Sequence, residues 1–170
     1  MNLNKTFLVL ALFLMQKTMS FCQDTGSLTP MPSTKEEFIK SEPAIISVAD
    51  WLENTPLNLE TDKRKYLNTL LLTWLTNSPT ITIEIDSKIT PLSKKNPDLL
   101  PVFMAGWTKY SLQNAYSKDP VKCNLAGIKS VLRVYKMGEG VKKDKDIDKL
   151  AELDAKNELE SWIAAKLEKK

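Results

Sequence analysis

Apolar side chains recur along most of the chain with the spacing that places them on one face of an α-helix. After Thr61 this spacing predicts a helix that ends at Asn77, because Ser78 and Pro79 follow it. The apolar positions of this helix are Tyr66, Leu67, Leu70, Leu71, Trp74 and Leu75. The pattern indicates an element that must bury one side against the rest of the protein.

Two further helices are predicted in the second half of the chain. One begins near Asn96 and Pro97, and its apolar face consists of Leu99, Phe103, Trp107 and Tyr110. The next begins at Asp119 and Pro120, a capping residue followed by the residue type favoured at the first helical position, and it ends at Gly138. Its apolar positions, the most regular in the sequence, are Val121, Leu125, Ile128, Leu132 and Tyr135.

Helix signals also stand at both ends of the expected folded region. Thr34 and Glu37 have the spacing of a capping box, and we expect a second helix start at Ser41-Glu42-Pro43, with an end before Pro56. Two short helices close the chain, marked first by Ile147, Leu150 and Ala151, then by Leu159, Trp162, Ile163 and Leu167. About six or seven helices, each apolar on one side, predict an all-α fold, a single-domain bundle or array over residues 34–170.

One segment departs from the helical period. Residues 80–86 read Thr-Ile-Thr-Ile-Glu-Ile-Asp, which alternates strictly and is typical of a half-buried extended segment. One interpretation is an extended connection whose isoleucines pack onto the helices. The other is a strand that pairs with residues 88–92 or with the edge of a partner protein.

The first 22 residues have the layout of a signal peptide. Lys5 precedes an apolar run at residues 6–15, which is too short to span a bilayer, and we expect cleavage after Cys22. The alternative is a lipid anchor on Cys22, against which the bulky Phe21 argues. Residues 23–33 have the composition of a flexible leader. The sequence thus predicts an exported protein, periplasmic or secreted, with no transmembrane span in the mature chain.

Charge and composition exclude several kinds of chemistry. The 170 residues contain 24 basic and 21 acidic side chains and no histidine, and removal of Lys5 and Lys17 with the predicted signal peptide lowers the net charge from +3 to +1. A nearly neutral chain has no electrostatic basis for binding nucleic acid. The missing histidine rules out imidazole catalysis and imidazole metal ligands. Cys123, the single cysteine expected in the mature chain, has no histidine to activate it and is interpreted as an inert thiol.

The remaining candidate sites are weak. Asp144, Asp146 and Asp148 resemble the opening of a calcium loop, but Lys149 stands where that loop needs glycine, so we interpret the aspartates as a helix start. We therefore predict no catalytic residues, no metal site and no cofactor. Ala105-Gly106 and Ala126-Gly127 place small residues within consecutive helices, which favours a close helix crossing.

The aromatic residues offer one candidate pocket. The four tryptophans, at positions 51, 74, 107 and 162, lie on four predicted helices and are interpreted mainly as core. A pocket lined by Trp74, Trp107 and Tyr110 is the alternative, because ligand sites are largely aromatic.

Four short motifs carry a resemblance that covers most of the expected mature chain. They are Ser-Phe-Cys-Gln at 20–23, Trp-Leu-Thr-Asn-Ser-Pro at 74–79, Ala-Gly-Trp at 105–107 and Leu-Glu-Ser-Trp at 159–162. Through them the chain resembles small exported all-helical proteins of Gram-negative bacteria, a group without an assigned activity, so the resemblance implies location and fold only.

Three functional hypotheses follow. The first is a non-enzymatic exported helical domain that binds a protein or a cell-envelope component. The second is a carrier with an aromatic pocket for a small ligand between its helices. The third is an enzyme that uses carboxylates among Glu152, Asp154, Glu158 and Glu160, which requires two of them to converge in one cleft.

Overall fold

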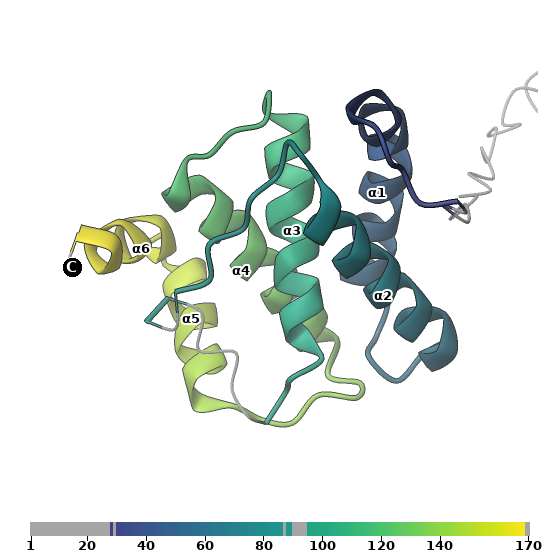
Figure 1. Ribbon diagram of the computed structural model, residues 1–170. Coiled ribbons are helices and arrows are strands. Elements are labelled where there is room, and N and C mark those ends of the chain that lie inside the picture. The colour runs from purple at the N-terminus through teal and green to yellow at the C-terminus, as the bar shows by residue number, and fades with distance from the viewer. Residues whose placement is uncertain (1–27, 29, 87, 90–94, 169–170) are drawn as a thin grey trace, which may run out of the picture.

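A computed structural model describes residues 28, 30–86, 88–89 and 95–168. Over these residues the chain forms six α-helices and no strand, packed as one domain, which confirms the predicted all-α fold. The helices are α1 Lys35–Asn54, α2 Thr61–Asn77, α3 Leu99–Gln113, α4 Pro120–Met137, α5 Lys145–Ala155 and α6 Leu159–Glu168. Figure 1 shows α3 in the middle of the molecule, α1 and α2 on one side of it, and α5 and α6 on the other.

The predicted helix ends are confirmed where a local capping signal exists. Thr34 and Glu37 form the reciprocal bonds of a capping box at α1. The Asp119 carboxylate accepts hydrogen bonds from the first backbone N–H groups of α4, and Asp144 does the same at α5. Gly138 ends α4 in the left-handed conformation, with φ 79°.

The helix start predicted at Ser41-Glu42-Pro43 is wrong, because α1 runs unbroken through these residues. A proline inside a helix removes one backbone hydrogen bond and crowds the preceding turn. Burial on both sides of Pro43 outweighs that cost: Phe38 and Ser41 precede it in the core, and a buried apolar stripe follows it, made up of Ile45, Val48, Ala49 and Leu52. The two predicted pieces are therefore one helix of 20 residues.

Two buried apolar clusters meet at α3. The first, the α1/α2 cluster, is centred on Ile45, Leu52, Leu71 and Trp74, and Ala105 of α3 belongs to it. The second, the α4/α6 cluster, contains the opposite face of α3 with Phe103 and Trp107, together with residues of α4, α5 and α6. The helix α3 thus contributes side chains to both clusters.

The close crossing of α3 and α4 predicted from the small residues is present. A methyl group added at Gly106 would lie 2.3 Å from the Ser130 hydroxyl oxygen and 2.8 Å from the Ala126 carbonyl oxygen. One added at Gly127 would lie 2.6 Å from the ring of Phe103. Both glycines therefore allow a helix-to-helix approach that alanine would prevent.

The apolar stripe predicted for α4 covers only part of its buried surface. Ile128 and Leu132 are buried, but Val121, Leu125 and Tyr135 are only half-buried. Buried positions also include Cys123, Asn124, Gly127, Val131 and Val134. The stripe is wider than predicted because α4 is in contact with α1, α3, α5 and α6.

Residues 80–86 run as an extended connection and form no strand within the described part of the chain, which agrees with the first interpretation, whereas pairing with the edge of a partner protein stays a prediction. Figure 1 shows the segment leaving α2 and crossing the face of α3. Ile81 is buried and Ile83 is half-buried, whereas Ile85 is 50 % exposed. Residues 90–92, the rest of the predicted pairing partner, lie outside the described residues.

The predicted signal peptide lies entirely outside the described residues, and so does most of the predicted leader. Of the leader, residues 28 and 30–33 are described, and Leu28 and Met31 pack half-buried against the α1/α2 cluster. Over the described residues, no helix combines the length with the apolar character that crossing a bilayer requires.

Candidate functional site

The structure does not bring the three predicted pocket residues together. Trp74 is fully buried in the α1/α2 cluster, where its ring packs on Phe38. Trp107 is 3 % exposed and belongs to the α4/α6 cluster, with Tyr110 half-buried beside that cluster. The expectation of one pocket lined by Trp74, Trp107 and Tyr110 is corrected accordingly, because the two indoles occupy different clusters.

The other two tryptophans, also predicted as core, are only partly buried, and each packs against the edge of one apolar cluster. Trp51 is half-buried, with the Lys63 ammonium nitrogen 4.7 Å from its ring centre and the Arg64 guanidinium carbon 5.2 Å from it. Trp162 is half-buried, with the Lys166 nitrogen 5.4 Å from its ring. These rings are covered by cations at the surface.

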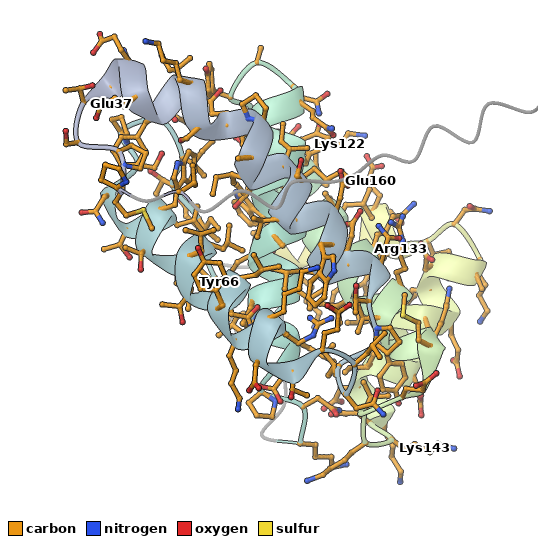
Figure 2. The ribbon with its side chains drawn as sticks, turned by 90° about the vertical axis from the view of Figure 1, so that its right-hand side faces the viewer. Glu37, Tyr66, Lys122, Arg133, Lys143 and Glu160 are labelled. Atoms are coloured by element: carbon orange, nitrogen blue, oxygen red, sulfur yellow. The ribbon has the colours of Figure 1, made fainter. Side chains whose placement is uncertain are left out.

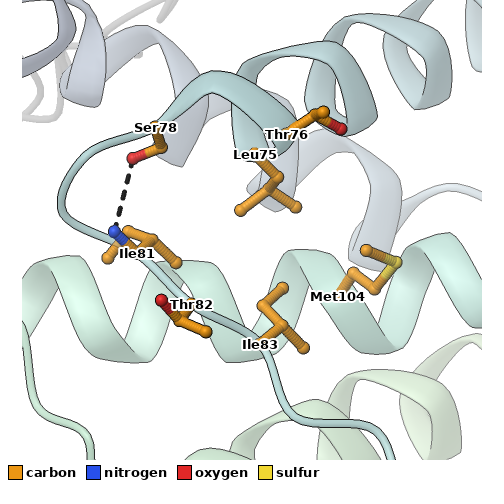
Figure 3. Close-up of a pocket in the computed structure, with 7 residues that line it drawn as sticks. All are labelled: Leu75, Thr76, Ser78, Ile81, Thr82, Ile83 and Met104. Carbon is orange, nitrogen blue, oxygen red and sulfur yellow. Dashed lines mark hydrogen bonds between the residues drawn. The ribbon is translucent and has the colours of Figure 1, made fainter.

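A hollow lies beside the extended segment, where α2 ends over α3. Its volume is about 350 Å³, and it is lined by Leu75, Thr76, Ser78, Ile81, Thr82, Ile83 and Met104. We call it the isoleucine groove. Leu75, Ile83 and Met104 point toward one another across it (Figure 3). The groove combines side chains from three parts of the fold, and its lining contains no charged residue.

Local chemistry explains why the chain opens this groove. Pro79 disfavours a helical Ser78, whose ψ of 128° turns the chain out of α2. The Ser78 hydroxyl oxygen accepts hydrogen bonds of 3.3 Å from the backbone N–H groups of Thr80 and Ile81, which fixes the turn (Figure 3). Ile83 then contacts both apolar clusters and anchors the segment over α3.

Beyond this turn the backbone of the described segment is open. Among the described residues, no hydrogen-bond partner is present for the N–H and C=O groups of residues 82–85. Thr82, Glu84 and Ile85 are exposed, so these polar groups face solvent. Within the described part of the chain, these four consecutive residues therefore leave both edges of the extended backbone open beside the isoleucine groove.

A second candidate is a polar cluster where α1, α3 and α4 meet. The Glu53 carboxylate, 3 % exposed, accepts hydrogen bonds from the Ser130 hydroxyl at 2.6 Å, the Lys109 ammonium at 2.6 Å and the Arg133 guanidinium at 2.9 Å. Lys109 also donates to Asp50. We call this set the Glu53 cluster. It lies against a shallow hollow of about 200 Å³.

The Glu53 cluster is built to join helices rather than to transfer protons. Burial opposes the charge of Lys109, but its hydrogen bonds to Asp50 and Glu53 outweigh that effect and raise the pKa of Lys109 above its ordinary value. A lysine with a raised pKa is protonated at neutral pH and cannot act as a base. These polar groups therefore link α1, α3 and α4 to one another through hydrogen bonds and ion pairs.

Cys123 is buried within the α4/α6 cluster. Burial, reinforced by the negative charge of Asp119, raises the pKa of Cys123 to about 11. Its sulfur lies 3.5 Å from the Ser117 carbonyl oxygen, to which the thiol donates. A thiol in this environment is neutral at physiological pH and is a poor nucleophile.

The predicted carboxylates do not converge in a cleft. Glu152 and Glu158 are exposed, and Glu160 pairs at 2.7 Å with Lys122, each side chain about half exposed (Figure 2). Asp154 lies near Lys129 and Lys136. Within the described part of the chain, no group of three His, Cys, Asp or Glu side chains could hold a metal ion.

Sequence reasoning missed both the groove and the Glu53 cluster as sites. The groove had one signal, the alternation at residues 80–86, but nothing in the sequence placed Met104 or Leu75 against it. The Glu53 cluster had none, because its partners lie 56 to 80 positions away along the chain. Comparison with known proteins yields no matching family, no similar curated protein and no similar solved structure.

Proposed function

We propose that this chain is an exported, non-enzymatic helical domain whose task is to bind a protein partner, and that the partner docks at the isoleucine groove. The observation that carries the proposal is the open extended edge at residues 82–85 beside an uncharged hollow. Exposed unpaired backbone next to apolar surface is the arrangement that protein chains use to capture extended segments.

The chemistry of the described side chains supports a binding role over a catalytic one. The Cys123 thiol is neutral, Lys109 is held as a cation, and the carboxylates of α5 and α6 are spread over the surface. Among the described residues these groups form no cleft in which two of them converge on a common substrate position.

Export to the periplasm or the medium is the second part of the proposal. It is supported by the basic residue and apolar run of residues 1–15 and by the small residues Ser20 and Cys22 ahead of Gln23. Intact-mass measurement of the protein from its native host tests it. A chain starting at Gln23 supports export by cleavage, a lipid-modified Cys22 supports export with an anchor, and an uncleaved Met1 contradicts both.

Site-specific crosslinking in the native host tests the binding role. A photoreactive residue is placed at Thr82 or Thr76 at the groove, and, as a matched control, at the exposed Lys145 of α5. We expect one discrete adduct from both groove positions and none from the control. Equal adducts from all three positions, or none from the groove, would contradict the proposal.

A further inference from the structure

We propose that the partner segment binds by strand addition: an extended peptide with alternating apolar residues and one basic residue pairs with the backbone of residues 82–85. This inference rests on the proposed function, because it names the mode and the chemistry of binding at the same groove. Three observations carry it: the direction of the free backbone groups, the position of the hollow, and the charge of Glu84, which has no ion-pair partner among the described residues.

The direction of the free groups follows from one hydrogen bond. In an extended chain the N–H and C=O of successive residues point to opposite edges. The Ile81 N–H points to Ser78 at the end of α2 (Figure 3). The backbone groups of Ile83 and Ile85 therefore face the same edge, toward the groove, and those of Thr82 and Glu84 face the other.

The hollow gives the added strand a place for its apolar side chains. On one face of a paired sheet, side chains of neighbouring strands lie about 5 Å apart. A peptide paired with the edge of Ile83 would place every second side chain beside that isoleucine, over Leu75 and Met104. Valine or isoleucine suits these positions, because β-branched residues favour an extended backbone.

Glu84 defines the charge of the occupant. Its side chain lies on the exposed face, opposite to Ile83, and within the described chain it forms no ion pair. A peptide residue directly across from Glu84 would share that exposed face, where opposite charges are favourable and like charges are not. The occupant therefore carries lysine or arginine at that position.

The proposal is tested with a synthetic probe and proline variants. The probe is a capped, fluorescent heptapeptide in which valine alternates with threonine, except for one central lysine. Ile85→Pro removes an N–H from the groove edge, and its matched control Asp86→Pro removes one from the opposite edge, at the residue that follows the paired segment; Ile85 is exposed and Asp86 is half-buried. We expect the first to weaken binding about tenfold and the second to change it less than about twofold.

The charge is tested by exchange. Glu84→Gln should lower the affinity for the probe that carries lysine. Glu84→Lys should bind a probe with glutamate in place of lysine more tightly than it binds the original probe. Circular dichroism verifies that every variant keeps its helices. Equal effects of the two proline variants, no saturable binding up to millimolar probe, or a charge exchange without effect would overturn strand addition.

The outcomes separate this inference from the function it refines. Discrete crosslinks at the groove with equal proline effects would leave the binding role intact and overturn the strand mode. If the adduct at Thr82 proves to be a second copy of this chain, the proposed partner is wrong, because the free edge then serves self-association.

Discussion

The indole N–H of Trp74 in α2 donates a hydrogen bond of 2.7 Å to the hydroxyl of Ser41 in α1. Both residues are buried, and the same hydroxyl donates to the Phe38 carbonyl at 2.7 Å. Ser41 thus satisfies the indole within a cluster that is otherwise apolar. The serine predicted to start a helix instead links two helices.

Ser41→Ala should lower the free energy of unfolding by about 1–3 kcal/mol, since it leaves a buried indole N–H without its partner. Urea unfolding followed by tryptophan fluorescence measures the change. Ser47→Ala is the matched control, because the Ser47 hydroxyl bonds only back to the Pro43 carbonyl of the same helix. Similar losses in the two variants would contradict the role given to the Ser41–Trp74 bond.

Glu53→Ala should be strongly destabilising, by about 3 kcal/mol, because three donors from two other helices lose a buried acceptor. The matched control is Glu160→Ala, whose pair with Lys122 is about half exposed and should contribute less than about 1 kcal/mol. Chemical unfolding of both variants tests the contrast. Equal effects would show that the Glu53 cluster is no more important than a surface ion pair.

Glu42 should contribute to the stability of the folded protein at acidic pH, where its carboxyl group is protonated. Burial raises the pKa of Glu42, and the hydrogen bond from Tyr116 offsets this only in part. The folded state therefore holds this proton more tightly, so the contribution is present below about pH 4.5 and is lost as the pH rises through the folded pKa. Glu42→Gln should exceed the natural protein in stability at pH 7 but not at pH 4.

Glu37 provides a control of opposite sign. Hydrogen bonds from the Ser33 backbone, the Ser33 hydroxyl and Thr34 lower the pKa of Glu37. Its contribution is present above about pH 4.5 and is lost as the pH falls through the folded pKa. Glu37→Gln should therefore reduce stability at pH 7. Unfolding curves recorded from pH 3 to 7 for both variants would refute these assignments if the two differences had the same sign.

The Cys123 thiol should react with a disulfide reagent at pH 8 only through opening of the fold. Its pKa of about 11 keeps the thiol neutral, and its burial excludes the reagent. We expect labelling to accelerate with urea in parallel with unfolding, whereas a surface cysteine placed at Lys145 should react at once. Rapid labelling of Cys123 in the native protein would be the contrary result.

Elements with a local signal could be predicted from sequence. The caps at Thr34, Asp119 and Asp144 and the left-handed Gly138 depend on neighbours within three residues, so the sequence alone indicates them. The helix start predicted at Pro43 was wrong because only the local cost of a proline inside a helix is visible in the sequence. The tertiary burial that outweighs this cost is not.

The candidate site could be predicted only in part. Alternation at residues 80–86 indicated the extended backbone and the inward direction of Ile81 and Ile83. The hollow depends on Met104, more than twenty positions away, and on where α2 crosses α3. Such placement is decided by helix packing across the whole domain, which periodicity does not encode.

Because α3 and Ile83 touch both apolar clusters, neither cluster can come apart while the other keeps its surroundings. Heat should therefore melt the described domain in one sharp cooperative step, with calorimetric and van't Hoff enthalpies that agree. The two clusters therefore unfold together as a single thermodynamic unit, because both contain side chains of α3.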